Sequence, residues 1–147
     1  MGEGQLKSDL EQMTKKLNVE DYIQFIGFRK DVLPIMKAAD LFVLSSISES
    51  MTHVLREAMS VKTACVATDV YGISELIEHE KSGYIVQPEN VEEIFKGIET
   101  VLDDAELKAK IEVNSLKRIE DAFTIQRMIN NTEELFTRLL KNKSALI

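Results

Sequence analysis

The chain has 147 residues, of which 44% are hydrophobic, and this is enough apolar material for the core of one domain. Its formal net charge of −7 argues against a nucleic-acid partner, because a nucleic-acid-binding surface needs a basic stripe. No stretch approaches the roughly 18 consecutive apolar residues of a membrane span, and the first residues lack the order of a secretory signal. We therefore expect a cytoplasmic location.

The first part of the chain predicts two helices with a strand between them. Apolar residues spaced by four, three and four positions predict a helix over residues 6–17, and Asn18 suits its end. The β-branched and aromatic run at residues 22–26 predicts a buried strand. Asp31 is expected to cap a short helix that runs to about Ala39.

The rest of the chain alternates between short apolar runs and helical spacing. Three further strands are predicted, at residues 41–44, 64–68 and 84–86. A polar loop at residues 45–50 follows the first of these strands. Helices are expected over residues 51–59, 74–78, 91–102 and 105–120, and a last helix begins after Phe123.

This alternation predicts the fold class. Strands that alternate with helices over short loops form βαβ units, so we expect an α/β fold with a parallel, Rossmann-like sheet and flanking helices. Ligands of such sheets bind at the carboxyl ends of the strands. The candidate site should therefore lie just after Ile26, Leu44, Thr68 or Val86.

Neither a disulfide nor a metal site is expected. Cys65 is the single cysteine, and its apolar neighbours indicate a small buried side chain. The two histidines are far apart in the sequence, and no metal-ligand spacing occurs. We expect no metal cofactor.

The loop after residue 44 carries the best candidates for chemistry. Glu49 is expected in the loop, and Glu57 about two turns into the following helix. The start of that helix, near Ser50 to His53, presents unpaired backbone N–H groups that favour phosphate. Ionised carboxylates accept hydrogen bonds from ribose or sugar hydroxyls, so this layout suits a sugar nucleotide. The competing interpretation is that two glutamates eight positions apart are simply solvated.

The segment from Ser45 to Gly83 resembles the signature region of family 4 glycosyltransferases with the GT-B fold. That region has a serine-containing loop, a glutamate, seven residues, and a second glutamate followed by Ala-Met, as in Glu49 and Glu57-Ala58-Met59. A strand, a glycine-containing turn with Glu-Leu-Ile, and a glycine before an apolar strand then follow in order. The corresponding positions are residues 65–69, 72–77 and 82–88.

The resemblance implies roles for individual residues. Glu57 would bind the ribose hydroxyls of the donor nucleotide, and Glu49, the candidate catalytic residue, would lie near the transferred sugar and its phosphate. The start of the helix would face sugar and phosphate oxygens, through Ser50 and the backbone N–H groups of Met51, Thr52, His53 and Val54. Phe28 and Arg29 would lie near the base.

The sequence departs from the family pattern at several of these positions. Ser50 replaces the usual glycine after the first glutamate, Met51 and Thr52 follow it, Tyr71 replaces a second glycine, and Ser74 stands where proline is common. These departures leave the identity of the donor sugar open.

By this resemblance the chain is a partial C-terminal, donor-binding domain. Residues 1–122 would form this domain, and residues 123–147 a helix that packs toward an N-terminal acceptor domain. That domain and the first strands of the donor domain have no counterpart here. Either the sheet has a gap between residues 22–26 and 41–44, or it rearranges, or another chain fills the gap. A fragment, a truncated gene product and half of a split enzyme all stay open as explanations.

The function expected from the resemblance is transfer of a sugar from a UDP- or GDP-sugar to an acceptor in glycan, polysaccharide or glycolipid biosynthesis. The transfer would retain the anomeric configuration and need no metal, and the complete enzyme could be peripheral to the membrane. We expect this chain alone to be inactive, and to self-associate or bind a partner chain. The alternatives are a non-catalytic partner subunit or degenerate domain used for assembly, and a dinucleotide-binding domain.

Overall fold

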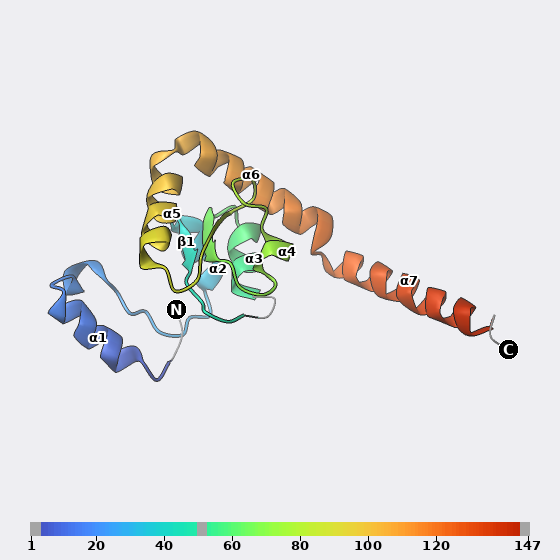
Figure 1. Ribbon diagram of the computed structural model, residues 1–147, viewed down its shortest axis with the longest axis horizontal. Coiled ribbons are helices and arrows are strands. Elements are labelled where there is room, and N and C mark those ends of the chain that lie inside the picture. Colours follow the sequence, from blue (N-terminus) through green and yellow to red (C-terminus); the bar gives the residue numbers. More distant parts are fainter. Residues whose placement is uncertain (1–3, 50–52, 145–147) are drawn as a thin grey trace. The chain divides into compact units, whose positions relative to one another are not determined.

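The computed structural model describes residues 4–49 and 53–144, which fall into two compact units divided after Pro34. The larger unit, from Ile35 onward, contains the sheet (Figure 1). Its elements are β1 (Phe42–Leu44), α3 (His53–Ser60), β2 (Cys65–Thr68), α4 (Ile73–Leu76), β3 (Tyr84–Val86), α5 (Val91–Asp103), α6 (Ala105–Ala122) and α7 (Ile125–Ser144). The helix α2 (Val32–Ala38) crosses the division between the units.

The sheet has three parallel strands in the order β1-β2-β3. Val43 lies opposite Val66 in the first pair, and Thr68 lies opposite Val86 in the second. All four residues of β2 are buried, which is why this strand appears in the sequence as an unbroken apolar run. The predicted parallel α/β fold and these three predicted strands are confirmed.

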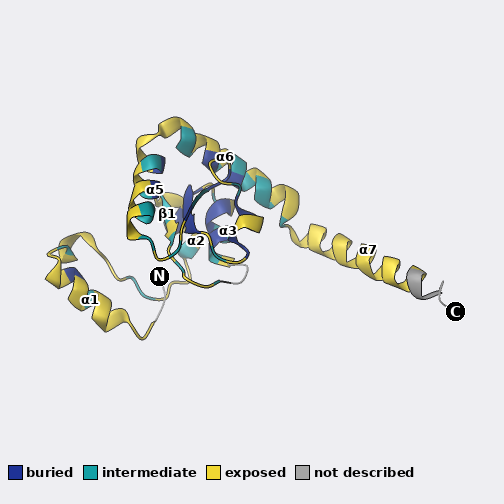
Figure 2. Cartoon of the chain, viewed as in Figure 1, coloured by how far each residue is buried: buried dark blue, intermediate teal, exposed yellow. Residues whose placement is uncertain are grey.

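Helices α5 and α6 supply the apolar cover of the central strand. Val66 of β2 and Val86 of β3 belong to one buried cluster with Val101 of α5 and Ile111 of α6. Figure 2 shows the buried residues concentrated in the central strand and in α3, whereas β1 contains no buried residue. The core of the larger unit therefore lies around β2.

Side-chain caps fix where α5 and α6 begin. The carboxamide of Asn90 accepts a hydrogen bond from the backbone N–H of Glu93 at 3.1 Å. The carboxylate of Asp104 accepts from the N–H groups of both Glu106 and Leu107. Each cap satisfies backbone N–H groups that have no partner within the helix, and so stabilises the start of that helix.

The smaller unit contains α1 (Lys7–Lys16) and a short 3₁₀ helix, η1 (Glu20–Tyr22). The predicted first helix is confirmed, and it ends as expected, because Asn18 takes the left-handed conformation with φ of 55°. The apolar stripe of this helix, however, is exposed, and its members are Leu6, Leu10, Met13 and Leu17.

The strand predicted over residues 22–26 is wrong. Tyr22 ends the 3₁₀ helix, and Ile23 takes an extended conformation with φ of −118° and ψ of 123° without belonging to a sheet. The backbone thus adopts strand-like angles, but no strand in the described part of the chain pairs with it. Of the three open alternatives, a gap within the sheet is not found among the described residues, since β1, β2 and β3 are hydrogen-bonded neighbours.

The last helix, α7, is exposed over residues 125–141. Its exposed apolar residues are Ile125, Met128, Ile129, Leu135, Phe136, Leu139 and Leu140. None of the helices in the described part of the chain is long and apolar enough to span a membrane.

Gly97 offers a test of how closely α5 packs on the sheet. A Cβ at this position would lie 2.8 Å from Cγ1 of Val86 and 3.2 Å from Cδ1 of Tyr84. We expect Gly97→Ala to lower the free energy of unfolding by about 1–3 kcal/mol, because a stiff β-branched neighbour has no room to retreat. Urea denaturation measures this change.

Gly4→Ala is the matched control, because a Cβ at Gly4 meets no atom within 4 Å. We expect its stability to stay within about 0.5 kcal/mol of the parent. Stabilisation by Gly97→Ala, as helix propensity alone would give, would contradict the close packing of α5 on β3.

Candidate functional site

The candidate site lies at the carboxyl ends of β1 and β2. The loop at residues 45–49 continues from β1, and α3 begins at His53. Glu49 lies in this loop and Glu57 lies in α3, as the sequence predicts. In a parallel sheet this edge is where ligands bind.

Glu49 is half-buried and is held by its own loop. The hydroxyl of Ser46 donates a hydrogen bond to Oε1 of Glu49 at 2.8 Å. The carboxylate thereby has one fixed donor and keeps acceptor positions for other hydroxyl or N–H groups.

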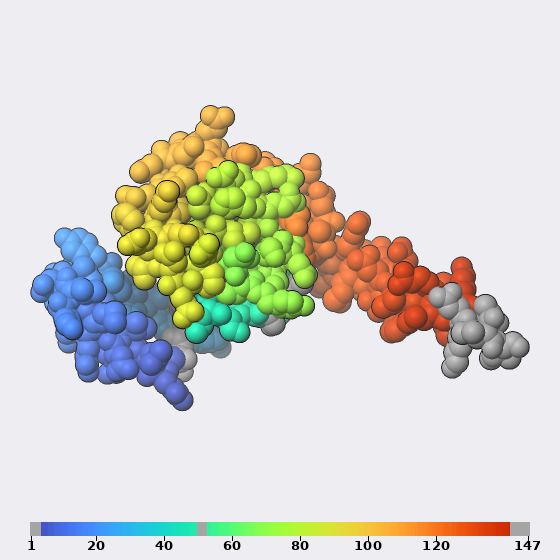
Figure 3. Space-filling model, viewed as in Figure 1, coloured from blue at the N-terminus to red at the C-terminus, as the bar shows by residue number. Residues whose placement is uncertain are grey.

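Thr68, the last residue of β2, joins this loop to the sheet. Its hydroxyl donates to the carbonyl oxygen of Ser46 at 2.5 Å. Figure 3 shows the atoms of the loop after β1, in teal, against those of the segment after β2, in green. The carboxyl ends of β1 and β2 are thus connected by side-chain hydrogen bonds as well as by the strand pairing.

Glu57 lies on α3, whose buried face consists of Leu55, Ala58 and Met59. Glu57 itself is half-buried, and no described residue makes a hydrogen bond or ion pair with its carboxylate. An anchored helix with an available carboxylate suits an acceptor of hydroxyl hydrogen bonds.

The first turn of α3 is described only from His53. Ser50, Met51 and Thr52 lie outside the described residues, so their predicted contacts with the donor stay predictions. His53 is exposed, and its Nδ1 accepts a hydrogen bond from Nη2 of Arg56 at 2.8 Å. Val54 is half-buried, and its backbone N–H belongs to the first turn, where helices leave donors free.

Phe28 and Arg29 belong to the smaller unit. The ring of Phe28 is 72% exposed. Arg29 holds Asp31 in a bidentate pair, with Nε–Oδ1 at 2.8 Å and Nη2–Oδ2 at 2.5 Å. The hydrogen bond from Arg29 keeps the pKa of Asp31 below its usual value. The expected contact of Phe28 and Arg29 with a base stays a prediction.

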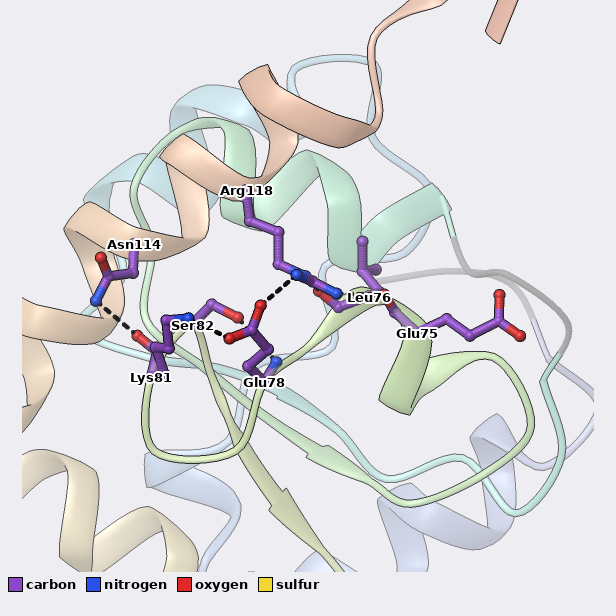
Figure 4. A network of polar contacts seen from close by, with 7 residues as sticks. All are labelled: Glu75, Leu76, Glu78, Lys81, Ser82, Asn114 and Arg118. Atoms are coloured by element: carbon purple, nitrogen blue, oxygen red, sulfur yellow. Dashed lines mark hydrogen bonds and ion pairs between the residues drawn. The ribbon is translucent and has the colours of Figure 1, made fainter. Parts of the chain in front are cut away.

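Arg118 forms a polar network that the sequence did not indicate (Figure 4). From α6 its guanidinium donates to the carbonyl oxygens of Leu76 at 2.5 Å and Glu75 at 2.7 Å, and it pairs with the carboxylate of Glu78. These contacts hold the segment after β2, including the end of α4, on the C-terminal half of α6. In the sequence Arg118 is one charge among many on a charged helix, and nothing distinguishes it.

Further contacts extend the network along the same segment. The side chain of Asn114 donates to the carbonyl of Lys81 at 3.1 Å, and the hydroxyl of Ser82 accepts from the N–H of Glu78 at 2.9 Å. The hydrogen bond from Lys81, together with the charges of Lys81 and Arg118, lowers the pKa of Glu78. Residues 75–82 are therefore tied to α6 at several points.

The described residues also bear on two other kinds of site, a cysteine nucleophile and a metal centre. Burial raises the pKa of the Cys65 thiol, which makes it a poor nucleophile. Within residues 4–49 and 53–144, no group of three or more His, Cys, Asp or Glu side chains is arranged to hold a metal ion.

The Arg118 network makes a testable contribution to stability. We expect Arg118→Met to lower the free energy of unfolding by about 1.5–3 kcal/mol, because two carbonyl groups and a carboxylate lose a charged donor. Urea denaturation gives the value. Lys117→Met, on an exposed position of the same helix, is the control and should change stability by less than about 0.5 kcal/mol. Equal changes in the free energy of unfolding for the two substitutions would mean that the network does not stabilise the fold.

Comparison with known proteins gives a family match that covers most of the chain. The family model for glycosyl transferases group 1 matches residues 1–118. The UDP-Gal:alpha-D-GlcNAc-diphosphoundecaprenol alpha-1,3-galactosyltransferase of Escherichia coli is 26% identical over 144 residues, which cover 97% of this chain and 37% of that enzyme.

Two solved structures resemble the fold closely. HepE of Anabaena, solved in complex with UDP, is 28% identical with a TM-score of 0.84, over 89% of this chain and 36% of HepE. The C-terminal domain of a glycosyl transferase group 1 protein of Francisella tularensis is 27% identical with a TM-score of 0.71, over 82% of this chain and 63% of that domain. The predicted fold, part of the C-terminal domain of a GT-B glycosyltransferase, is confirmed. The chain spans little more than a third of the E. coli enzyme and of HepE.

Proposed function

Because this chain belongs to the glycosyl transferases group 1, we propose that it is the donor-binding part of an enzyme that moves a sugar from a nucleotide-sugar to an acceptor. One observation carries the proposal. The loop that leaves β1 at the ligand-binding edge of parallel α/β folds carries a fixed carboxylate, Glu49, and the helix that follows this loop carries an available one, Glu57. Sugars and ribose are recognised through hydroxyl donors, which carboxylates accept.

UDP is the nucleotide that we propose. HepE has been solved with UDP and also with UDP-glucose, and the E. coli relative is named for a UDP-galactose donor. A pyrimidine diphosphate would place its phosphates at the start of α3, near His53 and Val54, because that end of a helix favours anions. Phe28 and Arg29 would contact the base.

Each carboxylate has a separate proposed task. Glu57 would accept hydrogen bonds from the ribose hydroxyls. Glu49 would lie near the transferred sugar, where a carboxylate can stabilise positive charge as the glycosidic bond breaks. As the family resemblance implies, the transfer would retain the anomeric configuration, use no metal ion, and serve glycan, polysaccharide or glycolipid biosynthesis.

The acceptor would bind to a further domain or partner chain. This chain matches little more than a third of the length of the E. coli enzyme and of HepE, and exposed apolar residues run along α1 and α7. Contiguous apolar surface of this kind marks sites of contact with other protein. The departing diphosphate also needs charge stabilisation, which cationic groups outside this chain would supply.

Nucleotide titration tests the proposed function. We expect the chain to bind UDP in calorimetry, and Glu57→Ala to weaken binding roughly 10- to 150-fold, because hydrogen bonds to a charged acceptor contribute about 1.5–3 kcal/mol. Glu99→Ala, on an exposed position of α5, is the control and should leave the affinity unchanged.

Other ligands separate the alternative functions. Binding of NAD in preference to UDP would indicate a dinucleotide-binding domain. Binding of none of UDP, GDP or NAD would indicate a non-catalytic domain used for assembly. Equal UDP affinities of the parent and Glu57→Ala would remove Glu57 from the ribose site.

The exposed apolar helices lead to a second experiment. We expect the purified chain to self-associate, because the apolar stripes of α1 and α7 are exposed, and to turn over no UDP-sugar. Light scattering measures the mass, and release of free sugar measures turnover. A monomeric chain that hydrolyses or transfers the sugar would contradict the need for a partner.

A further inference from the structure

A buried hydroxyl lies at the carboxyl end of β2 and is not used by the proposed donor contacts. Thr68 is 1% exposed, and its Oγ1 lies 2.5 Å from the carbonyl oxygen of Ser46 and 3.4 Å from that of Leu44. A hydroxyl has one proton to donate, so the shorter contact with Ser46 is the hydrogen bond.

This hydrogen bond leads directly to Glu49. Thr68 holds the backbone of Ser46, and the side chain of Ser46 donates to Glu49 at 2.8 Å. The three residues form a chain of hydrogen bonds from the rigid centre of the sheet to a loop carboxylate. Ser45, Ile47 and Ser48 in the same loop are exposed, so packing contributes little to its conformation.

We propose that Thr68 is a positioning residue that sets the orientation of Glu49 toward the sugar of the donor. The inference rests on the proposed function. Without the hydroxyl, the carbonyl of Ser46 loses its donor, and both the loop and the Ser46–Glu49 hydrogen bond lose their fixed geometry. Orientation errors of an ångström weaken contacts that depend on exact placement.

The proposal predicts different effects on the binding of the sugar and on the binding of the nucleotide. Glu49 would contact the sugar, whereas Glu57 and the start of α3 would contact ribose and phosphates. Loss of the Thr68 hydroxyl should therefore weaken binding of a UDP-sugar and leave binding of UDP itself unchanged. A general loss of stability would weaken both ligands alike.

Thr68→Val is the decisive variant, since valine keeps the β-branched shape of the side chain and removes the hydroxyl. Thr63→Val is its matched control. Thr63 is also buried, at 3% exposure, and its hydroxyl donates to the carbonyl of Met36 at 2.7 Å, at the other end of β2. The two variants lose the same chemical group, but only one of them touches the loop with Glu49.

Calorimetry with UDP, UDP-glucose and UDP-galactose gives the first measurement. We expect Thr68→Val to weaken the tighter UDP-sugar roughly three- to ten-fold, in line with one lost hydrogen bond, with UDP affinity within about two-fold of the parent. Thr63→Val should change neither the UDP affinity nor the UDP-sugar affinity, and Thr68→Ser, which keeps the hydroxyl, should bind both as the parent does. The proposal would be overturned if Thr68→Val weakened UDP and the UDP-sugar equally, or if Thr63→Val had the same effect as Thr68→Val. It would also be overturned if Thr68→Val bound UDP and the UDP-sugars with parental affinity.

Amide hydrogen exchange gives a second measurement that needs no ligand. We expect exchange of residues 45–49 to be faster in Thr68→Val than in the parent and in Thr63→Val. If the parent binds no nucleotide, the proposed function fails, and this measurement alone decides whether Thr68 orders the loop. Unchanged exchange in Thr68→Val would overturn the positioning role whatever the chain binds.

Discussion

The pairing of β2 with a parallel strand on each edge is the constraint on which the candidate site depends. Parallel pairing brings the carboxyl ends of β1, β2 and β3 to one edge, so the segments that follow them meet there although they are far apart in the sequence. The complete burial of β2 fixes this edge, because α5 and α6 pack their apolar residues around Val66. The loop with Glu49 leaves β1 and is also bonded to Thr68 at the end of β2, so it is attached to this edge at two strands.

Much of this fold could be predicted from the sequence, because burial leaves a pattern in it. The unbroken apolar run of β2 predicts a strand covered on both faces, and all four of its residues are buried. The helical spacing of α5 predicts the helix but not its buried face, because Val91, Phe95 and Leu102 of the apolar stripe are exposed. Residues 22–26 show the limit of this reasoning. Their composition favours a strand and Ile23 has extended angles, but a strand also needs a neighbour, and composition does not say whether one is present.

The parts of the site that could not be predicted are those made by single polar contacts. Glu49 and Glu57 stand out because their spacing repeats a family pattern. Thr68 looked like the last residue of a strand, and Arg118 looked like one charge on a solvated helix. Their partners, the carbonyls of Ser46 and Leu76, are backbone atoms, which carry no signature of residue type. A hydrogen bond to a carbonyl 22 or 42 positions away exists only once the chain is folded.

The two segments that follow β1 and β2 are held by different means, and this difference bears on their chemistry. Residues 75–82 are tied to α6 by the charged side chain of Arg118, so this segment depends on the helix as much as on the sheet. The loop with Glu49 is tied to the sheet by neutral hydroxyls, through Thr68 and Ser46. Neutral donors fix a carboxylate without neutralising its charge. A cation bonded to the same carboxylate would offset that charge and repel positive charge developing on the sugar. In the proposed function Glu49 faces developing positive charge on a sugar, and serine and threonine hold such a carboxylate without the repulsion that an arginine would add.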